Sequence, residues 1–277
     1  EGNLVSIKSE GSKFKIVTLP YEEYPELPAV KKESGIVLKQ NILKEMIRKT
    51  IFAISFDEVR PILTGVLFDV SGNELTMVAL DGFRMAVKKN SIINDNNFRA
   101  VIPGKTLTEI GKIINEKEEN VNIYFSKNHI QVQIEDTIIV SRLLEGEFIN
   151  YKQIIPSEYK IKIKVSSNLL MEACDRAALF ARDSSNNMIK FEINDDLMVI
   201  MSNSQNGDVH EELQIQKEGN DIEIAFNAKY FIDVLKVIEG EEITIEFTTN
   251  VSPSIIRPIN NEDYLYLVLP ARFKKNN

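Results

Sequence analysis

The sequence predicts an α+β protein built from two copies of one unit, each with antiparallel strands and two helices. The segments VIPGKTLTEIGKII (101–114) and AFNAKYFIDVLKVI (225–238) align without a gap, and their lysines coincide at two positions. Strands and helices also follow one another in the same order around both segments. This shared order favours duplication over a chance likeness of two amphipathic helices.

The first copy opens with an amphipathic helix. In NILKEMIRKTIFAIS (41–55) apolar residues recur three and four positions apart and form one helical face. Two alternating strands joined by a polar turn are predicted in VLFDVSGNELTMVAL (66–80). The helix of residues 101–114 comes next and precedes a strand, VNIYF (121–125).

The second copy repeats this order with a helix, paired strands, a second helix and a strand, in residues 167–181, 189–201, 225–238 and 243–247. The first thirty residues fit neither copy. They contain two short alternating strands around a Ser-Glu-Gly turn, like the end of a unit. We therefore expect the last strands of a preceding domain in residues 1–30 and complete units in residues 35–157 and 158–277.

The chain is acidic, yet its helices carry regularly placed cations. Lysine and arginine number 33 against 41 acidic residues, which gives a formal charge of −8. That balance alone argues against an ordinary DNA-binding domain. Each helix can nevertheless bury its apolar face and present cations on another, and a solvated helix face is the alternative explanation for any single lysine. The candidates for loose contact with phosphates are Lys44, Arg48, Lys49, Lys105, Lys112, Arg176, Arg182, Lys229 and Lys236.

Few residues are available for catalysis or metal binding. The only cysteine, Cys174, lies in an apolar helical stretch and is expected to be a buried core thiol. The two histidines, His129 and His210, have no metal-ligand spacing around them. No phosphate-binding, dinucleotide-binding or nucleophile-elbow motif occurs. We expect no catalytic residue, no metal site and no cofactor; a carboxylate-dependent enzyme using Asp57 or Asp69 is the alternative.

The segment VALDGFRMAVKK (78–89) predicts a strand that turns and resumes. Asp81-Gly82 is a turn signal, but Phe83, Arg84 and Met85 follow where a hairpin tip is normally short and polar. These side chains either fill the protein's own core or form a surface that a partner occupies.

Several segments resemble the bacterial sliding clamp, the beta subunit of replicative DNA polymerase III. The likeness extends over essentially the whole chain, in order. It rests on VRPILTGVLFDV (59–70), LTMVALDGFRMAV (75–87), SRLLEGEFINY (141–151), FNAKYFIDVLKVI (226–238), SPSIIRP (252–258) and DYLYLVLPARF (263–273).

The resemblance implies a ring of repeated clamp domains, each with two helices facing a central hole and antiparallel sheets outside. Double-stranded DNA would pass through the hole, and the protein would act as a processivity factor in the cytoplasm, associated with the nucleoid. In the family the first domain of one subunit meets the third domain of the next in a homodimer. Because this chain has two domains and the end of another, we expect ring closure only when the first domain is complete.

The resemblance also implies a pocket between the second and third domains. In the family it takes short linear peptides from polymerases, the clamp loader and repair proteins. Gly82 is expected to let backbone approach closely, and Arg60, Arg84 and Arg272 are expected to form the rim. The residues that match are Arg60, Leu63, Leu80, Gly82, Phe83, Arg84, Met85, Pro156, Ile161, Val251, Pro253, Leu267, Leu269, Pro270, Ala271, Arg272 and Phe273.

The chain departs from the family at two places. Phe83 stands where many relatives have histidine, and residues 274–277 extend beyond the family's usual end. Inter-domain core is the alternative role for the pocket residues. A peptide-binding adaptor that never surrounds DNA is the alternative function.

Overall fold

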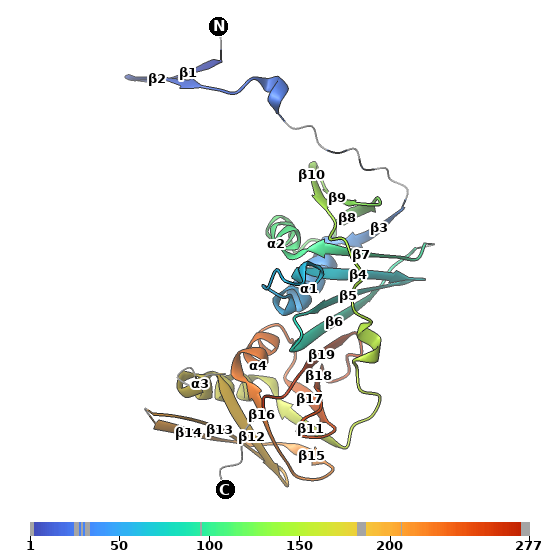
Figure 1. Ribbon diagram of the computed structural model, residues 1–277, viewed down its shortest axis with the longest axis vertical. Helices are drawn as coiled ribbons and strands as arrows, with labels where there is room; N and C mark the ends of the chain where they lie inside the picture. The colour runs from blue at the N-terminus through green and yellow to red at the C-terminus, as the bar shows by residue number, and fades with distance from the viewer. Residues whose placement is uncertain are drawn as a thin grey trace.

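The computed structural model describes residues 3–24, 28, 30, 34–94, 96–181, 187–205 and 207–272. Within these ranges the chain forms four α-helices and four antiparallel sheets, which confirms the α+β class (Figure 1). None of the helices described is both long and apolar enough to cross a membrane.

The first unit alternates strands with two helices. The α1 helix ends at Thr50, earlier than the sequence pattern predicts, and continues as a 3-10 turn. The elements are β3 (Ser34–Lys39), α1 (Gln40–Thr50), η2 (Ile51–Ala53), η3 (Pro61–Thr64), β4 (Gly65–Ser71), β5 (Glu74–Leu80), β6 (Arg84–Ser91), β7 (Phe98–Pro103), α2 (Gly104–Ile113), β8 (Asn120–Phe125), β9 (His129–Ile134) and β10 (Thr137–Arg142).

The second unit repeats this order after a short connection, as the sequence repeat predicts. The η4 turn (Tyr151–Gln153) lies in the connection. The elements of the second unit are β11 (Ile161–Ser166), α3 (Ser167–Ala181), β12 (Met188–Asn194), β13 (Leu197–Ser204), β14 (Gly207–Gln214), β15 (Gln216–Glu218), β16 (Ile222–Asn227), α4 (Ala228–Leu235), β17 (Glu242–Phe247), β18 (Ser254–Pro258) and β19 (Tyr264–Val268). The α2 and α4 helices occupy equivalent places in the two units.

A nine-stranded sheet joins the two units. Its strand order is β15-β11-β17-β18-β19-β6-β5-β4-β7, so β19 of the second unit pairs with β6 of the first. In that pairing Leu267 lies opposite Met85 and Val268 lies opposite Arg84. Figure 1 shows the four helices along one side of this sheet. We call the β6–β19 junction, with the segments that flank it, the seam.

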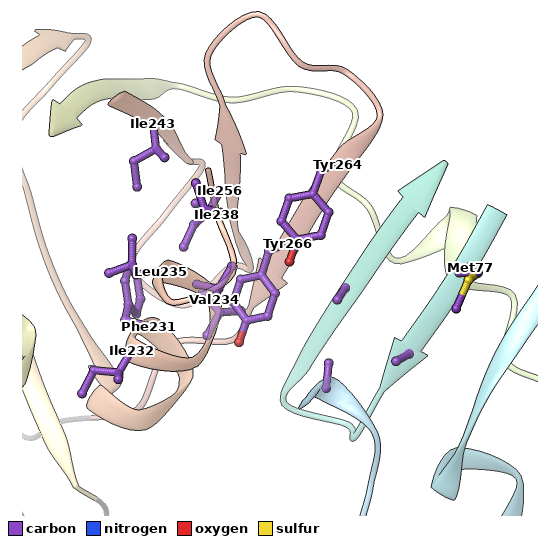
Figure 2. Close-up of a cluster of buried hydrophobic side chains, with 14 of the residues drawn as sticks. Met77, Phe231, Ile232, Val234, Leu235, Ile238, Ile243, Ile256, Tyr264 and Tyr266 are labelled. Atoms are coloured by element: carbon purple, nitrogen blue, oxygen red, sulfur yellow. The ribbon is translucent and has the colours of Figure 1, made fainter. Parts of the chain in front are cut away.

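The main core lies between the sheets and the helices. The α4 helix buries Phe231, Val234 and Leu235 against the strands of its own unit. Figure 2 shows Tyr264 and Tyr266 of β19 between these side chains and Met77 of the first unit. The apolar core is therefore continuous across the seam, which fixes the two units against each other.

The lone thiol lies in the core, as the sequence predicts. Cys174 of α3 is fully buried, and burial raises the pKa of its thiol well above the ordinary value. A neutral thiol of this kind acts as a small apolar side chain and is a poor nucleophile.

The N-terminal strands form a separate hairpin. Strands β1 (Leu4–Ser9) and β2 (Ser12–Val17) pair only with each other in the described structure, and a short turn, η1 (Tyr21–Glu23), follows. Every residue of both strands is exposed, including Ile7, Phe14 and Ile16. A two-stranded hairpin with both faces in water is marginal alone, so these apolar residues need further surface to cover them.

Candidate functional site

The turn between β5 and β6 is built by Asp81 and Gly82. The Asp81 Oδ1 atom accepts hydrogen bonds from the backbone N–H groups of Phe83, at 2.9 Å, and Arg84, at 3.0 Å. Gly82 adopts a φ of +92°, which glycine tolerates best. A Cβ added there would meet nothing within 4 Å. Gly82 therefore suits the turn conformation, and because the space beside it is open, the close approach of a partner's backbone there stays a prediction.

An apolar cluster forms on the face of the sheet that is turned away from the helices. Five residues expected in the pocket meet in it: Leu63, Leu80, Met85 and Leu267 are buried, and Leu269 packs against them. We call this the outer cluster. Its other buried members are Leu67, Val78, Val87, Val101, Phe148, Tyr151, Ile255 and Leu265.

Two of the expected pocket prolines line a neighbouring hollow. Pro156 and Pro253 border a cavity of about 240 Å³ together with Tyr159 and Ile255. Since Ile255 also belongs to the outer cluster, the cavity adjoins that cluster. Val251, on the loop before β18, leaves 73% of its surface exposed.

The segment after β19 is fastened to both units. The Leu269 N–H donates to the Phe83 carbonyl at 2.8 Å, and the Ala271 N–H donates to the Ala225 carbonyl at 2.7 Å. The intervening Pro270 is half-buried. The last described residue, Arg272, is exposed, and the expected pocket residue Phe273 lies outside the described residues.

Phe83 and Arg60 lie at the surface beside the outer cluster. The Phe83 side chain remains 59% exposed, and its ring stacks on Tyr230 with the centroids 6.3 Å apart. Arg60 is exposed at the start of η3, and its carbonyl accepts a hydrogen bond from the Leu63 N–H at 3.0 Å. Apolar surface and a cation therefore border the cluster.

Arg84 does not rim the pocket, contrary to expectation. Successive strand residues point to opposite faces, so Met85 reaches the outer cluster while Arg84 points toward the helices. The guanidinium is buried between the Phe52 and Tyr230 rings, 5.6 and 4.7 Å from their centroids. It donates to Asp81, Asp233 and the Phe52 carbonyl at 3.0, 2.6 and 2.8 Å.

The protonation of Arg84 is secured despite its burial. Desolvation alone would lower the pKa of the guanidinium. The nearby Tyr266 hydroxyl and the carboxylates of Asp233 and Asp81 outweigh that cost and raise the pKa above its ordinary value. Arg84 is thus a permanent buried cation with two carboxylate partners.

Ile161 packs in the core of the second unit and also borders a cavity with Thr249 and Asn250, directly before Val251. It is the first residue of β11, where Ile163 and Val165 alternate with lysines, and all three apolar side chains join the main core. Ile161 pairs with Phe247 of β17. Its contact with a bound peptide stays a prediction.

Most of the expected DNA-facing cations are exposed on the helices, and many have an acidic partner. Figure 1 shows that the helices carrying them follow one another along one side of the molecule. Arg48 pairs with Glu239, and Arg182 lies outside the described residues. The other pairs are Lys44–Glu116 at 3.4 Å, Lys112–Glu109 at 2.7 Å, Arg176–Glu211 at 2.8 Å and Lys229–Asp233 at 3.1 Å.

Lys105 and Lys236 are the exceptions: both are exposed, and neither forms an ion pair with a described residue. Binding to duplex DNA weakens as salt rises, and the slope of log K against log salt concentration counts the counterions released. We expect Lys105→Ala and Lys236→Ala each to make that slope smaller in magnitude by about one. Titrations at several salt concentrations measure this. Lys152→Ala, on η4 outside the helical face, is the control. Equal slopes for all three variants would contradict the assignment.

Lys49 is buried and does not face solvent, which corrects its assignment as a DNA-facing residue. Its Nζ atom lies 2.6 Å from Glu45 and 3.6 Å from Glu239, and Lys88 of β6 lies 3.4 Å from Glu45. Its side chain fills the junction of α1 with the second unit, where the Tyr264 hydroxyl donates to its carbonyl at 3.0 Å. Its charge therefore pairs with carboxylates at the seam.

Glu45 gives this cluster a pH dependence. Burial raises the pKa of Glu45, but the hydrogen bond and charge of Lys49, together with Lys88, outweigh burial and lower it below 4.5. A lowered pKa means that the stabilisation is present above the unfolded-state pKa and is lost as the pH falls. We expect Glu45→Gln to cost on the order of 1 kcal/mol at pH 7 and little at pH 3. Urea unfolding at both pH values tests this, with exposed Glu145→Gln as the control.

The two carboxylates proposed for an enzyme have structural partners and lie in different elements. Asp57 accepts the Val59 N–H at 2.9 Å in a loop. Asp69 on β4 accepts the Tyr151 hydroxyl at 3.2 Å, and burial together with Asp69 raises the pKa of Tyr151 to about 12. Across the described residues, no three His, Cys, Asp or Glu side chains gather as a metal site.

Sequence reasoning missed the residues around Arg84. The sequence patterns assigned no role to Asp233, Phe52 or Tyr230. One signal was available. Asp233 is the only acidic residue in YFIDVLKVI (230–238), a run whose only other charged residue is Lys236, and a carboxylate that is buried with the apolar residues needs a cationic partner.

Comparison with known proteins agrees with this architecture. Residues 37–150 match the central domain of the DNA polymerase III beta subunit, and residues 152–272 match its C-terminal domain. The beta sliding clamp of Staphylococcus aureus is 37% identical over 269 residues, which cover 96% of this chain and 71% of that protein.

Solved structures give the same result. The Bacillus subtilis sliding clamp superposes with a TM-score of 0.94 at 37% identity, covering 98% of this chain and 73% of that one. A Pseudomonas aeruginosa sliding clamp bound to griselimycin superposes with a TM-score of 0.92 at 27% identity, covering 99% and 74%. The chain belongs to the beta sliding clamp family, the beta subunits of bacterial DNA polymerase III.

Proposed function

We propose that the protein is a processivity factor that encircles duplex DNA and tethers the replicative polymerase, the clamp loader and repair proteins through the pocket at the seam. The observation that carries the proposal is the convergence of Leu63, Leu80 and Met85 with Leu267 and Leu269 in the outer cluster. Exposed Phe83 and Val251 beside a buried apolar floor suit a hydrophobic peptide anchor.

The proposed pocket draws on both units. Its floor is the five residues named above, and its walls come from loops and from the segment after β19. The wall and rim residues that we propose are Arg60, Gly82, Phe83, Pro156, Val251, Pro253, Pro270, Ala271 and Arg272. Partners would present short linear peptides with leucine and phenylalanine side chains.

The helical face suits a loose grip on DNA. Because most of its cations already have carboxylate partners, most phosphate contacts would replace an existing ion pair and gain little free energy. Weak contacts without base readout permit sliding, so retention on DNA would come from ring closure.

Two unpaired surfaces support a homodimeric ring. Strand β14 is the edge of its four-stranded sheet, and its outer side pairs with no strand in the part of the chain that is described. The β1–β2 hairpin exposes apolar side chains on the other end of the chain. We propose that residues 1–30 complete a first domain, that residues 35–157 and 158–277 are the second and third, and that the first domain of one subunit meets the third of the next.

Retention on closed DNA tests the proposal. The full-length protein, loaded onto a nicked circular plasmid, should stay bound through gel filtration and should dissociate after the plasmid is cut once. A labelled peptide containing leucine and phenylalanine should bind the present chain with a Kd on the order of micromolar. If the peptide binds but the protein is lost equally from circular and linear DNA, the result favours an adaptor that never surrounds DNA. Such a protein would act at the same pocket but would not be a clamp.

A further inference from the structure

Arg84 connects three elements at the inner side of the seam. Its guanidinium binds Asp81 of the β5–β6 turn, the Phe52 carbonyl of η2 and Asp233 of α4. The first two belong to the first unit and the third belongs to the second unit. A buried cation with this many charge-assisted hydrogen bonds holds one geometry, because loss of any partner leaves a buried N–H donor unpaired.

The same residues hold the wall of the pocket. Asp81 also binds the backbone N–H of Phe83, and the Phe83 ring stacks on Tyr230, which covers the Arg84 guanidinium. The Phe83 carbonyl in turn accepts the Leu269 N–H. Phe83 and Leu269 are therefore positioned through the bonds of Arg84, although Arg84 itself lies on the opposite face of the sheet.

Asp233 connects this arrangement to the helical face. Its Oδ2 atom lies 2.6 Å from Arg84 and 3.1 Å from Lys229, whose side chain is 60% exposed on α4. A phosphate that pairs with Lys229 withdraws that cation from the shared oxygen. Asp233 then bonds to Arg84 alone, and the bond strengthens.

We infer that Arg84 is a positioning residue for the peptide pocket and that Asp233 couples the pocket to Lys229, so that DNA and peptide strengthen each other's binding. The inference rests on the proposed function of the pocket and of the helical face. Because coupling between two binding sites is reciprocal, the effect of DNA on the peptide equals the effect of the peptide on DNA.

The repeat supplies a matched control. Glu109 occupies in α2 the position of Asp233 in α4, and it also pairs with a lysine, Lys112, at 2.7 Å. Glu109 is exposed and has no bond to Arg84. Asp233→Asn and Glu109→Gln each remove one carboxylate from the helical face, but only the first reaches the pocket.

Peptide affinity is measured by fluorescence polarisation with a labelled peptide containing leucine and phenylalanine, with and without a short DNA duplex at low salt. In the wild-type chain DNA should tighten peptide binding about 5-fold. Asp233→Asn should lower the affinity for the peptide about 10-fold and remove the effect of DNA on that affinity. Lys229→Ala, which frees Asp233 permanently, should bind the peptide without DNA about as tightly as the wild type does with DNA and should show no further DNA effect, and Glu109→Gln should change neither quantity. Arg84→Lys, which keeps the charge but not the planar fork, should recover part of the affinity that Arg84→Gln loses.

The outcomes distinguish a failure of the proposed function from a failure of the coupling between the two sites. Failure of the wild-type chain to bind the peptide would reject the proposed function itself. Wild-type binding with Asp233→Asn and Glu109→Gln behaving alike would reject the coupling and leave the pocket standing. Circular dichroism melts identify any variant that is unfolded; if Asp233→Asn does not fold, the Lys229→Ala comparison decides, and an unchanged DNA effect there overturns the inference.

Discussion

Glutamate in place of Leu269 is expected to weaken binding of the clamp-binding peptide by about 100-fold or more. Leu269 is half-buried and packs against the buried floor of the outer cluster, so a bound anchor side chain would contact it directly. A carboxylate there must be desolvated by the apolar peptide without a partner, which costs several kcal/mol. An interface hot spot of about 3 kcal/mol corresponds to roughly 100-fold in Kd.

Met85→Glu tests the same floor from the first unit. Because Met85 is only 2% exposed, its glutamate variant can also destabilise the seam, so Met85→Ala is measured beside it. Fluorescence polarisation with the labelled peptide gives the affinities. Ile138→Glu, on the exposed edge strand β10, introduces the same charge at an apolar surface position and should leave the Kd unchanged. Wild-type affinity in folded Leu269→Glu and Met85→Glu chains would exclude the pocket.

The seam has two chemically different sides. Its outer side is apolar and includes Leu267 opposite Met85. Its inner side adds ion pairs to the apolar core around Tyr264 and Tyr266: Arg84–Asp233 and Lys49–Glu239 cross between the units. Burial of apolar side chains stabilises the association of the two units. Buried charges with fixed partners define one orientation of the first unit relative to the second. Both are useful where a binding pocket is shared by two domains.

The repeat and the helices could be predicted because they are local patterns. The spacing of apolar residues in 101–114 and 225–238 is a property of each segment alone, and the structure places α2 and α4 within them. The core position of Ile161 could also have been predicted, because IKIKVS alternates and pairs Ile161 with Ile163 and Val165 on one face.

The roles of Arg84 and Lys49 could not be predicted in this way. Both look like surface cations in sequence, and each is buried by carboxylates far along the chain, Asp233 for Arg84 and Glu239 for Lys49. Periodicity shows which side of an element is apolar but not which distant charge will approach it. Pairing across the seam is a tertiary property, and it removed two of the expected functional residues from the surface.

Truncation of Phe231 is expected to cost about 3–5 kcal/mol in the free energy of unfolding. Phe231 is fully buried in α4, and its ring contacts those of Phe191 and Phe226 with centroid distances of 5.0 and 4.7 Å. Phe231→Ala leaves a cavity among strands that cannot close around it, since Phe191 and Phe226 are held in the β12–β16 pairing. The same helix carries Lys229 and Asp233, so the loss would reach both proposed binding surfaces.

Phe83→Ala is the matched control, because it removes the same side chain from a position that is 59% exposed. Phe83→Ala should lower the free energy of unfolding by well under 1 kcal/mol, as surface substitutions usually do. It should also lower the affinity for the peptide. Urea unfolding followed by circular dichroism gives both stabilities. If Phe231→Ala and Phe83→Ala lower the unfolding free energy equally, the core of the second unit is not organised around α4. In that case the positions assigned to Lys229 and Asp233 lose their support.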